Sequence, residues 1–203
     1  MKIQRIVALC KRRGLVSVFE DDEGTQWIGD GASLYPLYGL PRFDKDSFCH
    51  TYDIAGKQQD KIAFWYQWGM PEKIDCSDAA TGEIRTDRVG LTDIALSGHV
   101  YTPCMTQKGI AFFDRSYLRP LSDEPASLDI YERADEDGEI YFAVKAGFML
   151  KAVILPAKIL SRGLVQGLNT LAIHCEDALR FAGERDDRQL DGQGSLFQEG
   201  EKE

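Results

Sequence analysis

The chain has 203 residues, of which 43% are hydrophobic and 28% charged, a composition that supports a buried core and excludes a disordered chain. Its 33 acidic and 24 basic residues give a formal net charge of -9, which excludes a protein that coats nucleic acid with its whole surface. This net charge is still compatible with a local basic face that binds nucleic acid. Five cysteines without CxxC spacing argue against a disulfide framework or a zinc ribbon, and no apolar run is long enough for a signal peptide or a membrane span. We therefore expect a soluble, cytoplasmic protein without a membrane partner.

The first predicted element is a short amphipathic helix over residues 2–13. Its apolar residues follow the spacing i, i+3, i+4, i+7 from Ile3 to Cys10, and Gly14 ends it. Its polar side carries basic residues and no acid: Lys2, Arg5, Lys11, Arg12 and Arg13. Two interpretations stay open, a solvated face and a face that contacts the phosphates of DNA.

Two β-hairpins are predicted next, over residues 15–37 and 99–121, because both segments alternate and turn at polar or glycine-containing sequences. Between them lie a strand over 61–70 and a polar loop over 75–93. Within that strand, alternation places Trp65 on the face opposite its aromatic neighbours, so that at least one side belongs to the core.

The last third of the chain is predicted to contain strands within 127–134 and 139–159, joined by a turn of the Asp-Gly type, and then a long helix over 158–182 with a wide apolar stripe. Residues 183–203 are charged and aperiodic, and we expect a disordered tail there. The fold class is α+β: one domain over 1–182 with a mostly antiparallel sheet, two hairpin units, an N-terminal amphipathic helix and a long C-terminal helix.

The two hairpins end in similar sequences, GDGASLYPL and FDRSYLRPL. The shared residues are Asp30, Ser33, Pro36 and Leu37 in the first, and Asp114, Ser116, Pro120 and Leu121 in the second. The match indicates either an internal duplication, with halves at 1–74 and 94–159, or only the common chemistry of strand ends.

A basic helix, a strand, a turn with glycine and a strand with an Asp-x-x-Ser segment resemble the repeated half-domain of DNA sliding clamps. The segment MLKAVILPAKI at 149–159 also resembles the last strand of those clamps. The resemblance implies a clamp-like fold in which the basic helix faces duplex DNA. A chain of this length would then form a homo-oligomer in order to close a ring.

The tail contains the peptide QGSLF, with Gln193, Ser195, Leu196 and Phe197. It resembles the peptide by which bacterial replication and repair proteins bind the β sliding clamp, and this resemblance implies that clamp as a partner. An extended peptide of this kind offers a glutamine amide for hydrogen bonds and two apolar side chains for a preformed pocket. The alternative is that Leu196 and Phe197 pack against the last helix or a second subunit.

No motif in the chain carries enzymatic chemistry by itself, since nucleotide-binding loops, G-x-S-x-G and HExxH are all missing from the sequence. The pairs Cys49-His50 and His174-Cys175 are the strongest candidates for a metal or a Cys-His dyad. Adjacent residues diverge on a strand or a helix, however, so a core cysteine beside a surface histidine is the better interpretation. We expect no enzyme activity, cofactor or metal.

The sequence thus predicts an accessory protein of DNA replication or repair that binds the sliding clamp through its tail. One alternative is a clamp-like processivity factor that itself binds duplex DNA through Lys2, Arg5 and the basic residues 11–13. Another is a phage structural or host-interaction protein with no role on DNA, since the sequence also resembles prophage and mobile-element proteins in its general character.

Overall fold

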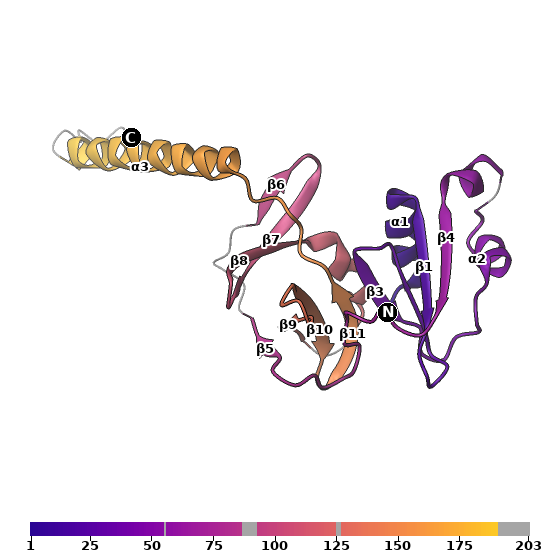
Figure 1. The fold of residues 1–203 in the computed structure, drawn as a ribbon. Helices are drawn as coiled ribbons and strands as arrows, with labels where there is room; N and C mark the ends of the chain where they lie inside the picture. Colours follow the sequence, from indigo (N-terminus) through magenta and orange to yellow (C-terminus); the bar gives the residue numbers. More distant parts are fainter. Residues whose placement is uncertain (55, 87–92, 125–126, 191–203) are drawn as a thin grey trace, which may run out of the picture. The chain divides into compact units, whose positions relative to one another are not determined.

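A computed structural model of the chain describes residues 1–54, 56–86, 93–124 and 127–190 (Figure 1). The helical elements are α1 (Ile3–Arg13), α2 (Lys45–Thr51), η1 (Gly56–Lys61), η2 (Arg115–Leu121) and α3 (Arg162–Leu190). The strands are β1 (Leu15–Glu20), β2 (Gln26–Gly29), β3 (Ser33–Pro36), β4 (Ala63–Trp68), β5 (Ile84–Arg85), β6 (Ile94–Leu96), β7 (His99–Thr106), β8 (Gly109–Asp114), β9 (Leu128–Ala134), β10 (Ile140–Ala146) and β11 (Met149–Ile154).

The strands form a mixed but mostly antiparallel arrangement, and the α+β class is confirmed. One sheet has the strand order β4-β1-β2-β3-β11-β10-β9-β5, and a second, three-stranded sheet has the order β6-β7-β8. Strands β1 and β4 run parallel, whereas the other strand pairs that the structure describes run antiparallel.

The N-terminal helix is confirmed as α1. Its apolar face is buried through Ile6, Val7, Leu9 and Cys10. Gly14 ends the helix in the left-handed region, with φ of 69°, and donates its N–H to the Cys10 carbonyl. A side chain at this position would be strained by that φ and would also approach the Lys61 carbonyl.

The first predicted hairpin is in fact three strands, because the segment after β1 turns a second time between β2 and β3. Asp30 makes this turn, since its Oδ1 accepts hydrogen bonds from the backbone N–H groups of Ala32 and Ser33. Gly29 permits it, because a Cβ there would lie 1.7 Å from the Ser33 carbonyl oxygen. Gly29 therefore ends β2, and Gly31, with φ of 82°, lies in the tight turn itself.

The second predicted hairpin is confirmed as β7 and β8, but the segment after Asp114 is the short 3-10 helix η2 instead of a strand end. The two similar sequences consequently occupy different places: Asp30 lies between the strands β2 and β3, whereas Asp114 is the last residue of β8 and caps η2. The predicted strand region 139–159 also folds as two strands, because Gly147 turns the chain between β10 and β11 with φ of 62°.

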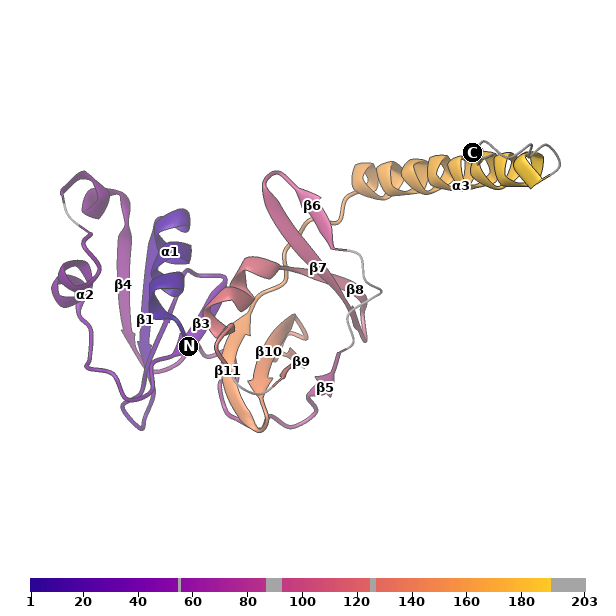
Figure 2. The same cartoon turned by 180° about the vertical axis from the view of Figure 1, so that it is seen from behind.

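Six of the eight strands in the large sheet belong to two runs that each consist of a helical segment and three antiparallel strands, and β4 and β5 are the edge strands. The first run is α1 with β1, β2 and β3, and the second is η2 with β9, β10 and β11. The last strands of the two runs, β3 and β11, pair antiparallel at the junction and lie side by side in both views (Figure 2). The Tyr35 hydroxyl donates to the Tyr117 carbonyl at 2.8 Å, and the Tyr117 hydroxyl donates to Asp30 at 3.1 Å, which ties the runs together.

Both faces of the large sheet carry buried apolar side chains. The larger cluster includes Ile6, Val18, Tyr35, Phe113 and Phe142. It thus packs α1 and the second sheet against one face of the large sheet. The smaller cluster lies on the opposite face and contains Phe19, Trp27, Leu34, Tyr141, Ala143, Leu150 and Val153. Strand alternation explains this separation, because Val18 and Phe19 are neighbours that point to opposite sides.

The chain divides into two compact units, residues 1–158 and residues 159–203, and this division falls inside the single domain that we expected over 1–182. Helix α3 begins later than predicted because the Ser161 hydroxyl accepts a hydrogen bond from the Leu164 N–H, as an N-cap does. It continues to Leu190, into the segment that we assigned to the tail. Several of its apolar side chains are exposed, among them Leu171, Leu179 and Phe181.

Candidate functional site

The five basic residues predicted to bind DNA do not form one free row along α1. Lys2 pairs with Asp123 at 2.7 Å, and Arg13 lies 3.9 Å from the buried carboxylate of Asp30. Lys11 donates to the Tyr52 carbonyl at 3.2 Å. Each of these three side chains is thus directed by its own partner within the body of the protein.

Arg5 and Arg12 differ from the other three, because both line a hollow between α1, η2 and the β7–β8 hairpin. They are seven positions apart, so they lie on one side of the helix, two turns from each other. Arg5 donates from Nη1 to the Arg119 carbonyl and to the Ser122 hydroxyl, both at 2.9 Å. Arg12 donates from Nη2 to Asp114 and to the Ser116 hydroxyl.

This hollow, which we call the cationic cleft, has a volume of about 480 Å³. Its charged and titratable lining residues are Arg5, Arg12, Arg115, Arg119, His99 and Asp114. Four arginines and one carboxylate therefore line this hollow, in a chain whose net charge is -9. Because a hollow lined mostly by one sign of charge focuses the electric field, the cleft favours anions in a chain that is acidic overall.

Asp114 organises the polar groups of the cleft. Its Oδ2 accepts from Arg12 at 3.1 Å and lies 2.7 Å from His99 Nδ1, while its Oδ1 accepts from the Ser116 N–H at 2.8 Å. Burial raises the pKa of this carboxyl, but the interactions with Ser116, His99 and Arg12 outweigh burial, and the pKa lies below its ordinary value. Asp114 is therefore ionised at neutral pH and holds both the arginine and the imidazole in place.

The two arginines of η2 complete the cleft. Arg115 pairs through Nη1 with Asp93. Among the residues that the structure describes, the Arg119 guanidinium has no hydrogen-bond or ion-pair partner. The sequence does carry a signal for these two side chains, since Arg115 and Arg119 are four residues apart with no acid between them.

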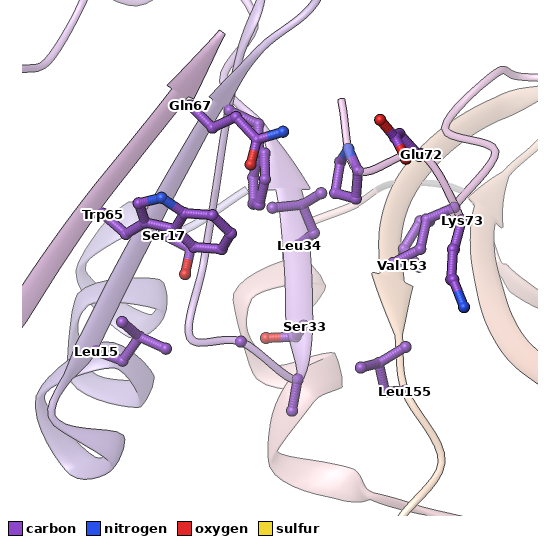
Figure 3. Close-up of a pocket in the computed structure, with 15 residues that line it drawn as sticks. Leu15, Ser17, Ser33, Leu34, Trp65, Gln67, Glu72, Lys73, Val153 and Leu155 are labelled. Carbon is purple, nitrogen blue, oxygen red and sulfur yellow. The ribbon is translucent and has the colours of Figure 1, made fainter. Parts of the chain in front are cut away.

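A second hollow, which we call the apolar groove, lies on the face of the large sheet that carries the smaller core cluster. It has a volume of about 470 Å³. Figure 3 shows Leu15 and Trp65 on one side, Val153 and Leu155 on the other, and Leu34 between them. Trp65 is 54% exposed and meets the ring of Phe19 edge-on, with 5.6 Å between the ring centroids.

The aromatic side chains of strand β4 lie on both of its faces. Phe64 packs against the larger core cluster, and Trp65 lies on the opposite face, as alternation predicted. The Tyr66 hydroxyl donates to the buried carboxylate of Glu20 at 2.5 Å. Strand β4 therefore packs against the core through Phe64 and lines the apolar groove through Trp65.

The remaining candidates lie in separate parts of the chain. Cys49 and His50 lie in α2, whereas His174 and Cys175 lie in α3, in the other compact unit. Over the described parts of the chain, no group of three or more metal-binding side chains is found, and no helix is long and apolar enough to cross a membrane. The clamp-binding candidates Gln193, Ser195, Leu196 and Phe197 lie outside the described residues.

The fold and the cleft thus define an α+β protein with a cationic hollow between its first helix and its second sheet. No family model, no curated protein and no solved structure matches the chain.

Proposed function

We propose that this protein is a cytoplasmic accessory factor of DNA replication or repair, which contacts DNA through the cationic cleft and a bacterial β sliding clamp through its tail. The observation that carries the proposal is the convergence of four arginines in one hollow of an otherwise acidic chain. Phosphate groups of nucleic acid are the polyanions for which such a hollow is suited, because Arg offers several N–H donors in a planar fork.

The clamp is proposed as partner on the basis of the peptide at 193–197. In the sequence, this peptide follows the long helix α3, which ends at Leu190. The arrangement suits an adaptor that holds DNA with one part and a replication protein with another.

The DNA part is tested by fluorescence anisotropy of a labelled duplex with the full chain at low and moderate salt. We expect affinity to fall with salt, and to fall further when Arg5→Gln and Arg119→Gln are combined. The matched control, Lys57→Gln with Lys61→Gln, removes the same charge from an exposed segment outside the cleft. Affinity that is independent of salt, or equal losses in both double variants, would reject the cleft as the DNA site.

The clamp part is tested by calorimetry with a purified bacterial β sliding clamp. We expect binding at about micromolar concentration that is lost when Leu196→Ala and Phe197→Ala are combined. A control with Glu199→Ala and Glu201→Ala alters the same tail outside the peptide and should retain binding. If the wild-type chain does not bind the clamp, the peptide match is a coincidence.

A second candidate function, a clamp-like processivity factor, is favoured by the two helix-plus-three-strand runs that meet at β3 and β11. Such a protein would need several copies to surround DNA. Sedimentation of the full chain distinguishes the two functions, because a monomer at micromolar concentration cannot close a ring.

A further inference from the structure

The cationic cleft is compact, and its charges converge on one place instead of following a line. We infer that it binds a phosphate monoester, the dianionic group at the end of a nucleic-acid strand or on a free nucleotide, in preference to the internal diesters of a duplex. The inference rests on the proposed function only where the phosphate belongs to the end of a DNA strand, because a free nucleotide would bind the same cleft without any role on DNA.

The distribution of charge favours a concentrated anion. Arginines from α1 and η2 line a hollow of about 480 Å³, and Asp114 is the carboxylate that lines it. A duplex backbone spreads single charges along its length, whereas a monoester carries a charge of about -1.5 to -2 on one group at neutral pH. A convergent set of guanidinium groups therefore gains more from the monoester.

The donors that remain open also suit a monoester. Arg5 and Arg115 each use Nη1, and Arg12 uses Nη2, for contacts within the protein. Their other N–H groups, and the whole Arg119 guanidinium, are without a partner among the described residues. A monoester presents three terminal oxygens to such donors, whereas a diester presents two, so more of the open N–H groups find an acceptor.

The partners of these side chains keep the cleft in a defined shape before any ligand arrives. The Arg119 and Ser122 contacts hold Arg5, and Asp114 holds both Arg12 and His99. Because ionised Asp114 accepts from His99 Nδ1, the imidazole is oriented with Nε2 as its remaining polar atom. Side chains that are already ordered lose less conformational entropy when they bind.

The test compares two labelled duplexes that differ only in whether a 5′ end carries a phosphate or a hydroxyl, with the full chain and anisotropy as the readout. We expect the phosphorylated duplex to bind about tenfold more tightly, as one or two additional charge-assisted hydrogen bonds would provide. Arg119→Gln should abolish this preference without unfolding the protein, since its guanidinium has no described partner to lose. Lys11→Gln, which removes a charge from the same region outside the cleft, should leave the preference unchanged.

A third arm separates the sources of the phosphate. Deoxyadenosine 5′-monophosphate and deoxyadenosine are titrated into the protein by calorimetry. Binding of the monophosphate alone, without binding of either duplex, would support the monoester site and reject the DNA function. Equal binding of both duplexes would leave the DNA function in place and overturn the monoester site. If Arg119→Gln kept the full preference for the phosphorylated duplex, the monoester site would also be overturned.

Discussion

The cationic cleft and the apolar groove have nearly the same volume, about 480 and 470 Å³, yet their linings are opposite. The cleft is built by side chains from segments far apart in sequence, such as Arg12, His99 and Arg119. The groove is built mostly by one face of a sheet, where Leu15, Phe19 and Trp65 follow from alternation in two paired strands. Size therefore says little about what a hollow of this protein can hold, and the chemistry of the walls decides it.

The difference also separates stability from binding. The walls of the groove belong partly to the core, since Phe19, Leu34 and Val153 are buried in the smaller cluster. The arginines of the cleft are exposed and only partly paired. We therefore expect substitutions in the groove to act on folding, and substitutions in the cleft to act on ligands.

The largest expected effect is the destabilisation of the groove by Phe19→Ala. Because Phe19 is 6% exposed and packs within a core cluster, its truncation should lower the free energy of unfolding by about 3 to 5 kcal/mol. Trp65→Ala is the comparison. Trp65 contacts the ring of Phe19 but is half exposed, so its truncation should lower the free energy of unfolding by about 1 kcal/mol. Urea unfolding measures both. Equal losses of unfolding free energy would contradict this difference in burial between the two rings.

A buried ionic cluster offers the counterpart to the exposed arginines. Glu83 pairs with Arg133 and Lys145, which are almost completely buried. Glu83→Gln leaves two buried cations without their carboxylate and should cost about 3 kcal/mol. Burial raises the pKa of Glu83, but hydrogen bonds from Lys145 and Arg133 lower it below its ordinary value of 4.5.

This lowered pKa gives the same substitution a signature in pH. A carboxyl whose pKa is depressed in the folded state stabilises the protein above its unfolded pKa, and that stability is lost as the pH falls through the folded value. In urea unfolding between about pH 5 and pH 3, the wild-type chain should lose stability more steeply than Glu83→Gln. Parallel curves would mean that Glu83 does not form these ion pairs in solution.

Much of the fold could be predicted from the sequence, because it depends on local patterns. The 3.6-residue period identified α1, and alternation with turn residues identified the hairpin β7–β8. The turn at Asp30 was missed as a strand boundary because β2 and β3 are only four residues each. The pairing of β3 with β11 could not be predicted, since no local pattern specifies which distant strands become neighbours.

The cleft could be predicted only in part. The basic residues of α1 were visible, but their separation into two that line the cleft and three that contact other partners depends on what packs beside the helix. His99 and Arg115 lie about a hundred residues further along the chain, and nothing in the sequence links them to Arg12. Contacts at such separations follow from tertiary packing, which composition and spacing do not encode.

A smaller effect distinguishes the cleft from the helix surface as a whole. Arg12→Gln should weaken DNA binding about tenfold, because Arg12 lines the cleft and also neutralises Asp114. Lys11→Gln removes the neighbouring charge but should weaken binding by less than about twofold, because Lys11 is directed toward the Tyr52 carbonyl. Anisotropy at one fixed salt concentration measures both. Equal losses would show that DNA contacts the exposed helix and not the cleft.

The smallest expected effect is the change in stability on removing the arginine that has no described partner. Arg119→Gln should change the free energy of unfolding by less than about 0.5 kcal/mol, since an exposed side chain without contacts contributes little to folding. Arg5→Gln should cost about 1 kcal/mol, because Arg5 ties α1 to the end of η2 through two hydrogen bonds. If Arg119→Gln destabilised the protein as much as Arg5→Gln, its guanidinium would have a structural role. A loss of phosphate binding without a loss of stability would instead mark Arg119 as a side chain retained for its ligand.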